Sequence, residues 1–401
     1  MSTFFRFFPA FSLILACAFG VRAEPRYTSA LIEPINSFHN HGSCIVELPN
    51  GDLLASWYKG HGEKGDDSVK IVGARLRKGE EKWSEVFDMA DFEGFPDCNS
   101  ALVVDKEKKL WMFWPLLVAN RWETAILMAR ISTDYNTPGA PNWTWQTPIL
   151  LKPGDVFAED VAAAVEEFKK TLPKELVEAY GDELAKLKEE AADKYTRRMG
   201  WMPRSKATVL DSGRILMPLY SDGFSFGLVA ISDDHGKTWT ASRPIISLGG
   251  VQPSIVPRSD GSLVAYLRDN GPPPKRVIYS ESTDGGMSWS MGKDSELLDS
   301  GAGVEGLRLA NGHILVIHND AEKGRHTMAI HLSDDDGKTW KWMRHAERWE
   351  PDKGAAAYPS FTLASDGSII ACYTYTNKTD NPGETIKYIR FNEEWIMEGD
   401  K

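Results

Sequence analysis

Three short runs of nearly identical residues recur at a fixed distance in the second half of the chain. They read SDDHGKTW, STDGGMSW and SDDDGKTW, begin at Ser232, Ser282 and Ser333, and all fit Ser-x-Asp-x-Gly-x-x-Trp. The tryptophans that end them are 50 and then 51 residues apart. A motif with such a period indicates one supersecondary unit that is copied around an axis or along a stack.

The residue types of these runs have a mechanical interpretation. Asp and Ser side chains close turns by hydrogen bonding to the backbone, Gly adopts backbone angles that cost other residues more, and Trp anchors the turn on the sheet. We therefore interpret the runs as turn clamps and not as catalytic groups. They resemble the Asp boxes of the bacterial neuraminidase repeat proteins, whose best-known members are sialidases with a six-bladed β-propeller.

Short apolar segments separated by turn residues recur along the rest of the chain. Such strand–turn–strand units are typical of β-hairpins. Their turns contain Asn50-Gly51, Ser212-Gly213, Asp260-Gly261, Asn311-Gly312 and Asp366-Gly367, and the unit at 98–114 uses Lys-Glu-Lys-Lys. Counting the units predicts an all-β, six-bladed propeller over residues 24–401, in which the segment 26–34 closes the ring by pairing with 386–391.

One segment, about 155–199, has a helical and not a strand pattern. Its apolar residues are spaced three and four apart, which places each set on one helical face; the sets are Val161, Val165, Phe168, Leu172 and Leu176, Tyr180, Leu184, Leu187. We expect an α-helical hairpin inserted between blades two and three. It either packs on the side of the propeller, or forms a rim over the site or a dimer contact.

The amino terminus has the pattern of an export signal. Arg6 precedes an apolar run at 7–19, and Val21-Arg22-Ala23 provides a cleavage site after Ala23. The run is shorter than the roughly 20 residues that a membrane anchor needs. We therefore expect residues 1–23 to be a signal peptide and the protein to be secreted or periplasmic.

Charge and cysteine content exclude several classes of protein. The net charge of −11 becomes −13 when Arg6 and Arg22 are removed, which argues against nucleic acid or an anionic membrane as partner. Cys44, Cys98 and Cys372 are odd in number and have no CxxC spacing, so neither a zinc site nor a disulfide framework is indicated. We expect no cofactor and a carbohydrate partner, and the oligomeric state stays open.

The resemblance to sialidases implies a set of functional residues. Sialidases hold the carboxylate of the substrate with three arginines and use a Tyr nucleophile sharpened by a Glu, with an Asp as acid/base. On this pattern the second and third clamp arginines are Arg268 and Arg325, the nucleophile is Tyr358, its partner is Glu305, and the acid/base is Asp66 or Asp67 in the loop 59–67. Each of these residues also has a structural interpretation. The two arginines could form salt bridges between blades, Tyr358 could be a core residue, and Glu305 could be a solvated strand residue.

The first clamp arginine is missing, and His41 stands in its place. This change resembles the predicted-neuraminidase branch of the superfamily and makes sialic acid doubtful as the substrate. His41 has three interpretations: a general acid or base, a metal ligand together with His39, or a structural histidine bonded to a neighbouring blade. Asn99, Gln252 and Asn319 are candidates for hydrogen bonds to sugar hydroxyls, and Arg204 and Lys206 for an extension of the cationic pocket. The candidates for stacking on a sugar are Trp57, Trp114 and Trp201.

Three functions are compatible with these residues. The first is an exported sialidase-like hydrolase of a terminal acidic sugar, with Asp67 or His41 as proton donor. The second is a polysaccharide lyase or a non-sialic glycosidase centred on His41, acting on a uronate- or rhamnose-containing glycan. The third is a glycan-binding propeller without turnover. A fold alone does not choose among them.

Overall fold

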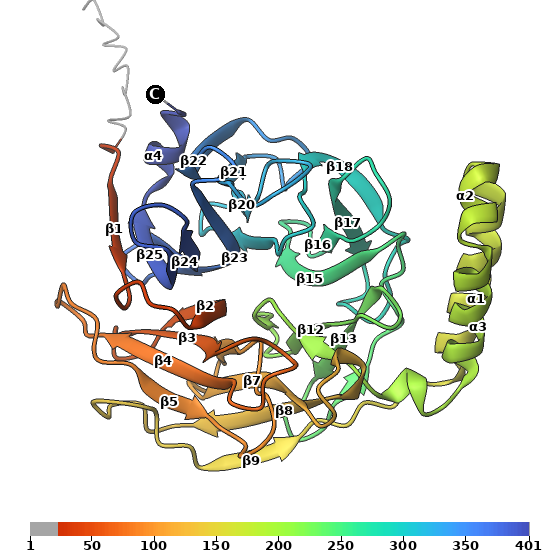
Figure 1. The fold of residues 1–401 in the computed structure, drawn as a ribbon, viewed down its shortest axis with the longest axis horizontal. Helices are drawn as coiled ribbons and strands as arrows, with labels where there is room; N and C mark the ends of the chain where they lie inside the picture. The colour runs from red at the N-terminus through yellow and green to blue at the C-terminus, as the bar shows by residue number, and fades with distance from the viewer. Residues whose placement is uncertain (1–22, 401) are drawn as a thin grey trace, which may run out of the picture.

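The computed structural model describes residues 23–400, and its strands form six antiparallel sheets arranged in a ring (Figure 1). We number these sheets as blades in chain order. Blade 1 contains β2 (His39–Glu47), β3 (Leu53–Gly60), β4 (Lys70–Leu76) and β5 (Phe87–Ala90). Blade 2 contains β6 (Ala101–Val104), β7 (Leu110–Leu117), β8 (Ala125–Ser132) and β9 (Trp145–Pro148). Blade 3 contains β10 (Met202–Pro203), β11 (Thr208–Val209), β12 (Ile215–Ser221), β13 (Phe226–Ser232) and β14 (Thr240–Ala241).

The second half of the ring repeats the same order. Blade 4 contains β15 (Gly250–Pro257), β16 (Leu263–Asp269), β17 (Arg276–Ser282) and β18 (Lys293–Leu298). Blade 5 contains β19 (Glu305–Arg308), β20 (Ile314–His318), β21 (Thr327–Ser333) and β22 (Trp342–Arg348). Blade 6 contains β23 (Gly354–Leu363), β24 (Ile369–Asn377), β25 (Gly383–Phe391) and β1 (Tyr27–Leu31), and a short helix, α4 (Glu393–Met397), follows it.

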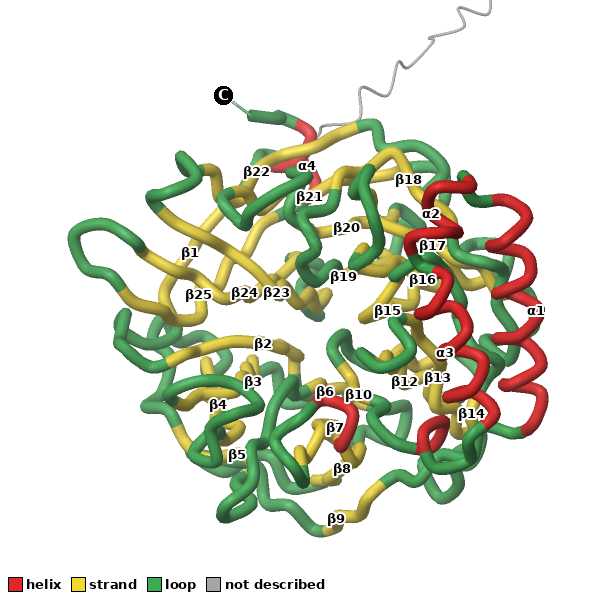
Figure 2. Tube along the Cα trace, turned by 45° about the vertical axis from the view of Figure 1, so that its right-hand side comes forward, coloured by secondary structure: helices red, strands yellow, loops and turns green. Residues whose placement is uncertain are grey.

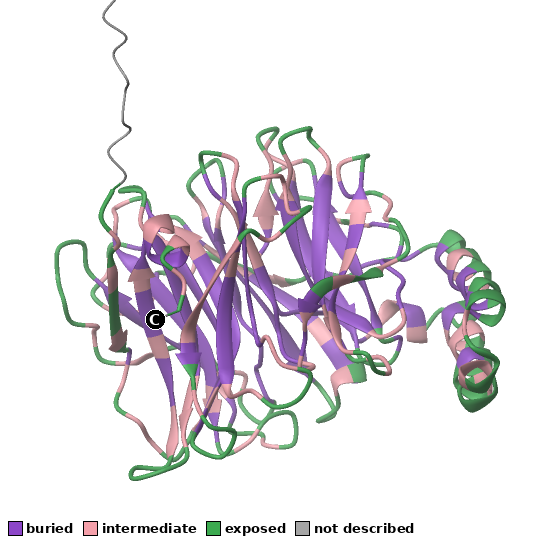
Figure 3. Cartoon of the chain, turned by 90° about the horizontal axis from the view of Figure 1, so that it is seen from above, coloured by how far each residue is buried: buried purple, intermediate pink, exposed green. Residues whose placement is uncertain are grey.

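The first and last strands close the ring as the sequence predicts. β1 pairs with β25 in antiparallel register from Tyr27 opposite Phe391 to Leu31 opposite Lys387. The first strands of the blades lie nearest the axis, since β2 contacts β6 and β23, and β19 contacts β15 and β23. The six-bladed propeller expected from the sequence is therefore confirmed. Figure 3 shows that the strands are buried for most of their length while the connecting loops are exposed.

The three repeated runs form the same turn between the third and fourth strands of blades 3, 4 and 5. In the first, the Ser232 hydroxyl donates to Asp234 at 2.9 Å and accepts from the Gly236 amide at 2.8 Å, while the Trp239 indole donates to the Gly236 carbonyl at 3.2 Å. Asp234 also accepts from the Thr238 amide at 2.9 Å. The turns are fixed by their own side chains, as a clamp requires.

Gly236→Ala is expected to destabilise the protein more than Gly367→Ala. Both glycines have a positive φ, +80° and +82°, so alanine carries a conformational cost of about 1–2 kcal/mol at either position. A Cβ at Gly236 would lie 2.0 Å from the buried Trp111 ring, whereas nothing lies within 4 Å at Gly367. The difference between the two urea-unfolding midpoints therefore measures the clash alone. Equal midpoints would contradict this packing.

The helical insertion lies between blades 2 and 3 and consists of α1 (Asp155–Thr171), α2 (Lys174–Ala179) and α3 (Gly181–Ala192). The sequence predicts two helices, but the second is interrupted at Tyr180. Figure 2 shows the helices in red along one side of the propeller. Phe157, Val161 and Phe168 of α1 are buried in the same apolar cluster as Phe224 and Phe226 of blade 3. The insertion therefore packs on the side of blade 3.

Short 3-10 helices at Trp122–Thr124 and Thr196–Arg198 complete the secondary structure. Between residues 23 and 400, no helix has the length and apolar character needed to cross a bilayer. The expected export signal at 1–23 lies outside the described residues except for Ala23, and it stays a prediction.

Candidate active site

A polar cavity of about 220 Å³ lies where the inner strands of the blades converge. Six of the residues that the sequence singles out line it: His41, Asn99, Gln252, Arg268, Arg325 and Tyr358. The sequence did not single out the others, which are Tyr58, Glu63, Trp122, Tyr220, Asp222 and Asn270. Every blade contributes at least one side chain, so residues spread over some three hundred positions meet at one site.

A repeated backbone irregularity aims several of these side chains. The inner strands of blades 4 and 6 contain a bulge after Val251 and after Ala357, and the next residue, Gln252 or Tyr358, has a positive φ of +56° or +54°. Asn99 in blade 2 has a φ of +42°. A β-bulge changes the direction in which a side chain points. Non-glycine residues with a positive φ are uncommon and concentrate at functional sites.

The corresponding position in blade 1 is Gly42, with a φ of +65°. A Cβ there would lie 2.8 Å from the ring of Tyr58 and 3.0 Å from the side-chain oxygen of Asn99. Only glycine leaves room for these two cavity residues. At the bulge of blade 1, the absence of a side chain therefore gives Tyr58 and Asn99 their place.

Tyr358 stands at the centre of the site. Its hydroxyl accepts a hydrogen bond from Arg268 at 2.8 Å and another from the Gln252 amide at 3.3 Å. The Arg204 and Arg325 guanidinium groups lie 4.7 Å and 5.3 Å from the centre of its ring. Three arginines therefore surround one phenol, and among the described residues no carboxylate is hydrogen-bonded to its hydroxyl.

These arginines have no acidic partners in residues 23–400. Arg268 and Arg325 form no salt bridge in that range, which contradicts the alternative of inter-blade ion pairs. Arg204 is buried and donates to the Pro359 carbonyl at 2.7 Å, while its Nε and Nη1 have no partner. Because a buried guanidinium without a counter-ion is costly, the site favours an anionic ligand.

His41 is 4 % exposed and fixed between blades. Its Nδ1 lies 2.8 Å from the hydroxyl of Thr374 in blade 6, and its ring centre lies 4.1 Å from that of Tyr358. Burial, followed by the charge of Arg325, holds the pKa of His41 well below its usual range. The histidine is thus bonded to a neighbouring blade, as one alternative supposes, and it presents a neutral imidazole to the cavity.

Glu63 is the carboxylate that the blade 1 loop brings to the cavity. Its Oε1 accepts from the Tyr58 hydroxyl at 2.9 Å and lies 3.2 Å from Nε2 of His39, whose Nδ1 lies 2.7 Å from Glu384. The hydrogen bond with His39 lowers the pKa of Glu63. Burial acts to lower the pKa of His39, but hydrogen bonds to Glu384 and Glu63 raise it to about 9. Glu63 is therefore an ionised, oriented group.

The metal interpretation of His39 and His41 finds no support in this geometry. Both ring nitrogens of His39 face carboxylates, and Nδ1 of His41 faces Thr374. In the part of the chain that the structure describes, no three His, Cys, Asp or Glu side chains are grouped as metal ligands would be. Cys44, Cys98 and Cys372 are buried and free.

The His39 contacts make stability depend on pH. Because the folded pKa of about 9 lies above the usual value of 6.5, the stabilisation is fully present below pH 6.5 and is lost as pH rises through about 9. The difference in unfolding free energy between the natural protein and His39→Gln should therefore shrink over this window. Denaturant titrations at several pH values measure it, and Glu384→Gln should flatten the curve. A gap that widens with pH would contradict the assignment.

Asp222 is the second acid at the cavity, on the loop after β12. Its side chain reaches solvent, but the protein around it raises its pKa by desolvation, an effect larger than the lowering by Arg268. No described residue donates a hydrogen bond to its carboxyl group. Of the two cavity carboxyls, the pKa of Asp222 is therefore raised while that of Glu63 is lowered.

Several candidates lie elsewhere. Asp67 accepts from Asn120 at 2.6 Å, and Asp66 caps the amides of His61 and Ser68, so neither lines the cavity. The expected loop is correct, but Glu63 is its cavity residue. Offsets of three or four residues, as between Glu63 and Asp66 or Asp67, are set by loop conformation, which local sequence does not encode.

Glu305 does not touch the Tyr358 hydroxyl. It is 1 % exposed, and its Oε1 accepts from the Phe361 amide at 2.9 Å and the Ser360 hydroxyl at 3.1 Å, so it joins blade 5 to blade 6. It is neither a solvated residue nor the partner of Tyr358, whose neighbour is Gln252. Lys206, 3.8 Å from Glu305, donates to the Ile45 carbonyl at 2.8 Å.

The remaining sugar-binding candidates are also structural. Asn319 donates to the carbonyls of Thr327 and Ala356 and is buried. The indoles of the three expected stacking residues are buried and donate to protein acceptors; these are Trp57, Trp114 and Trp201. Trp122, in the first 3-10 helix, is the tryptophan at the cavity.

One sequence signal could have revealed two of the missed residues. Tyr58, Tyr220 and Arg268 are each the sixth residue of the second strand of their blade. Aligning the second strands from their first residue would therefore have placed both tyrosines beside the arginine.

Comparisons with known proteins agree with this fold. Residues 199–371 match the model of the BNR repeat-like domain. A sialidase of Micromonospora viridifaciens is 30% identical over 175 residues, which is 41% of this chain and 25% of that protein. The matched region is thus only about a quarter of that relative's length.

Two solved structures are similar over nearly the whole chain. A protein of unknown function from Dyadobacter fermentans has a TM-score of 0.67 at 14% identity and covers 92% of this chain and 99% of its own. The intramolecular trans-sialidase from Ruminococcus gnavus has a TM-score of 0.63 at 15% identity, with coverage of 90% and 96%. At such identities the likeness concerns the fold.

Proposed function

Because the chain belongs to the sialidase/BNR-repeat superfamily, we propose that it is a glycoside hydrolase that releases a terminal acidic sugar from a glycan. The single observation that carries the proposal is that Arg268, bonded to the Tyr358 hydroxyl, and Arg325, over the Tyr358 ring, converge in one cavity without a salt bridge to any described carboxylate. Guanidinium groups hold carboxylates by paired hydrogen bonds, which gives both affinity and orientation.

In this proposal the residues divide the work as follows. Arg325 and Arg268 bind the carboxylate of the sugar, and the Tyr358 oxygen attacks the anomeric carbon. Arg268 donates to that oxygen and stabilises the negative charge that develops on it. Asp222 gives its proton to the leaving glycosidic oxygen, a role that suits a carboxyl with a raised pKa. Water then releases the sugar.

Tyr358 departs from the sialidase pattern in one respect, since its hydroxyl meets the Gln252 amide and not a carboxylate. An amide does not take the phenol proton. His41 is a neutral imidazole whose ring centre lies 4.1 Å from that of Tyr358, with the two rings tilted by 53°. We therefore assign proton removal from Tyr358 to His41 within the proposed reaction.

A panel of glycans with terminal sialic, ketodeoxy and uronic acids tests the proposal. Release of a reducing acidic sugar, identified by mass spectrometry, is the expected result, and a fluorinated analogue of the accepted sugar should label Tyr358. Retention of a glycan without any product would identify a binding propeller instead.

The neutral His41 favours a second candidate, a uronate lyase. A base beside two guanidinium groups can remove the proton next to a carboxylate that those groups neutralise. Such a reaction yields an unsaturated, ultraviolet-absorbing product. It should depend on His41 and be little changed by Tyr358→Phe, whereas the hydrolase should depend on both residues.

We further propose that the protein acts outside the cytoplasm, on the basis of the export pattern at 1–23. Amino-terminal sequencing of the protein from culture medium or periplasm tests this, with Glu24 as the expected first residue.

A further inference from the structure

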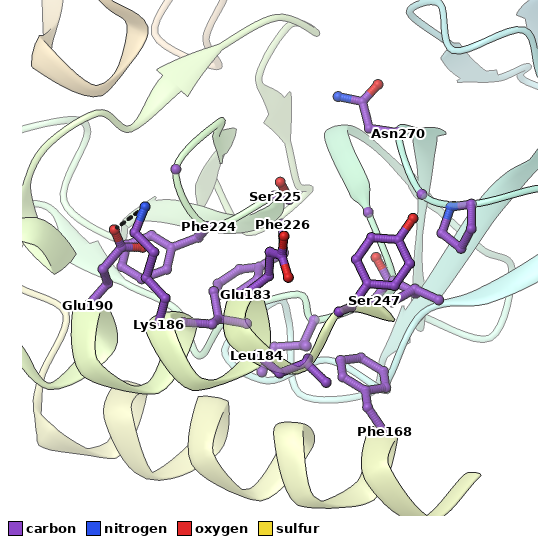
Figure 4. A pocket seen from close by; sticks show the side chains of 18 residues that line it. Phe168, Glu183, Leu184, Lys186, Glu190, Phe224, Ser225, Phe226, Ser247 and Asn270 are labelled. Atoms are coloured by element: carbon purple, nitrogen blue, oxygen red, sulfur yellow. Dashed lines mark ion pairs between the residues drawn. The ribbon is translucent and has the colours of Figure 1, made fainter. Parts of the chain in front are cut away.

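A second cavity, of about 350 Å³, lies between the helical insertion and blades 3 and 4. Figure 4 shows Phe224, Phe226 and Ser247 facing Leu184 and Phe168 across this cavity. The helical insertion and the propeller thus contribute opposite walls. The cavity exists only because the insertion packs beside the propeller.

The two cavities share a wall. Asn270 lines both, and Asp222 of the axial cavity is followed directly by Gly223 of the second one. The proposed proton donor, Asp222, therefore stands at the boundary between them. In a glycosidase the proton goes to the oxygen that joins the terminal sugar to the rest of the glycan, so the remainder of the substrate must leave the axial cavity near this boundary.

The chemistry of the second cavity differs from that of the axial cavity. Its walls are mostly apolar, from Phe168, Leu184, Leu187, Phe224, Phe226, Ile246, Leu248 and Pro272, with Ser225, Ser247 and Asn270 as polar groups. At the rim Lys186 pairs with Glu190 at 3.4 Å, while Glu183 adds an acid that forms no salt bridge among the described residues. No basic residue is in excess, so this cavity does not favour an anion.

We propose that the second cavity is an aglycone subsite, which binds a neutral group with an apolar face that is attached to the terminal acidic sugar. This inference rests on the proposed function for the identity of the sugar. An apolar sugar face or an aryl group gains affinity from aromatic and aliphatic walls with a few polar groups. The enzyme would therefore prefer single acidic caps on neutral glycans over chains of acidic sugars.

The subsite is preformed. Phe168 and Leu184 belong to the same buried cluster as Phe224 and Phe226, and Arg243 of blade 3 pairs with Asp160 of α1. The insertion is therefore held on the propeller by the apolar contacts of Phe168 and Leu184 and by the ion pair of Asp160. A preformed site binds without the cost of ordering its own walls.

Leu187 is the best position for a test, since it lines the cavity and is only partly buried. Leu187→Trp fills the space and Leu187→Ala removes the contact with little risk to folding. Val156→Trp is the matched control, because Val156 is 49% exposed, lies on α1 of the same insertion and does not line the cavity. Thermal melting confirms that each variant is folded.

The first measurement uses phenyl β-D-glucoside as a neutral probe and follows its binding by saturation-transfer NMR. We expect binding to the natural protein, at least a tenfold loss in both Leu187 variants, and no change in Val156→Trp or Arg325→Met. Absence of binding, or loss only in Arg325→Met, would overturn the subsite. This arm needs no turnover, so it stands even if the proposed function fails.

The second measurement compares methyl and phenyl glycosides of the accepted acidic sugar. Leu187→Trp should lower kcat/KM for the phenyl glycoside at least tenfold and leave the methyl glycoside unchanged, since only the former reaches the second cavity. Equal losses for both substrates would count against the subsite, whereas hydrolysis of neither by the natural protein would count against the proposed function.

Discussion

Arg325→Met is expected to lower kcat/KM for an acidic-sugar glycoside by about 10- to 100-fold, mostly through KM. The Arg325 guanidinium lies 5.3 Å from the Tyr358 ring centre and has no salt bridge to give up when a carboxylate binds. A hydrogen bond to a charged group contributes about 1.5–3 kcal/mol, which corresponds to this range. Steady-state kinetics with a chromogenic glycoside measure the effect.

A neutral substrate isolates the charge interaction. The carboxamide analogue of the same sugar should be a poor substrate for the natural protein, and Arg325→Met should cost it little further. The double-mutant cycle between arginine and carboxylate then gives their coupling energy. Equal losses with acid and amide would mean that Arg325 has a structural and not an anion-binding role.

Arg308→Met is the matched control. Arg308 is also half-buried and belongs to blade 5, but it ends the inner strand β19 and does not line the axial cavity. Removing one cation from the same blade without changing the cavity should leave KM unaltered. A similar loss in this variant would indicate a general effect of net charge.

The propeller was predictable because its signals are local. Five of the six hairpin turns carry their own glycine, and Gly51, Gly213 and Gly312 all adopt the positive φ that such turns require. The ring closure was predictable because the strand-like segment at 26–34 has no neighbour in sequence with which to pair. The strand at 386–391, at the other end of the chain, is its partner. The interruption at Tyr180 was not predictable, since both halves of the helix keep the same apolar spacing.

The predicted cavity residues lie on strands that the repeat defines, namely His41, Gln252, Arg268 and Tyr358, or two residues before such a strand, namely Asn99 and Arg325. Gln252 on β15 and Tyr358 on β23 hold equivalent positions in the repeat, and Arg268 follows from the second strand of its blade, β16. Glu63 and Asp222 lie on loops whose course depends on contacts with other blades. Glu305 shows the opposite error. It begins an inner strand and was therefore predicted to belong to the site, but its carboxylate accepts a hydrogen bond from the Phe361 amide of the next blade.

Tyr358→Phe is expected to reduce kcat roughly a thousandfold or more while KM changes little, since nucleophile removal abolishes the covalent route. The ring remains, so its contacts with Arg204 and Arg325 persist. Only the oxygen that accepts from Arg268 and Gln252 is lost. Single-turnover kinetics separate binding from chemistry, and a loss below tenfold would remove Tyr358 from the reaction.

Gln252→Glu tests how the hydroxyl is activated. The Gln252 amide lies 3.3 Å from the Tyr358 oxygen, so a carboxylate there reaches the phenol proton, and Arg268 is near enough to compensate its charge. Because a positioned general base contributes about 10²–10⁴-fold, we expect a rate increase of about tenfold or more.

The increase must require the hydroxyl, since the new carboxylate has no other proton to take in this route. Gln252→Glu should therefore add nothing in the Tyr358→Phe background, and it should relieve the dependence on His41 if that histidine is the natural base. An increase without the tyrosine oxygen would mean that the carboxylate activates water directly. No increase in either background would mean that proton removal from Tyr358 does not limit the rate, and the hydrolytic role of this tyrosine would then depend on the labelling result alone.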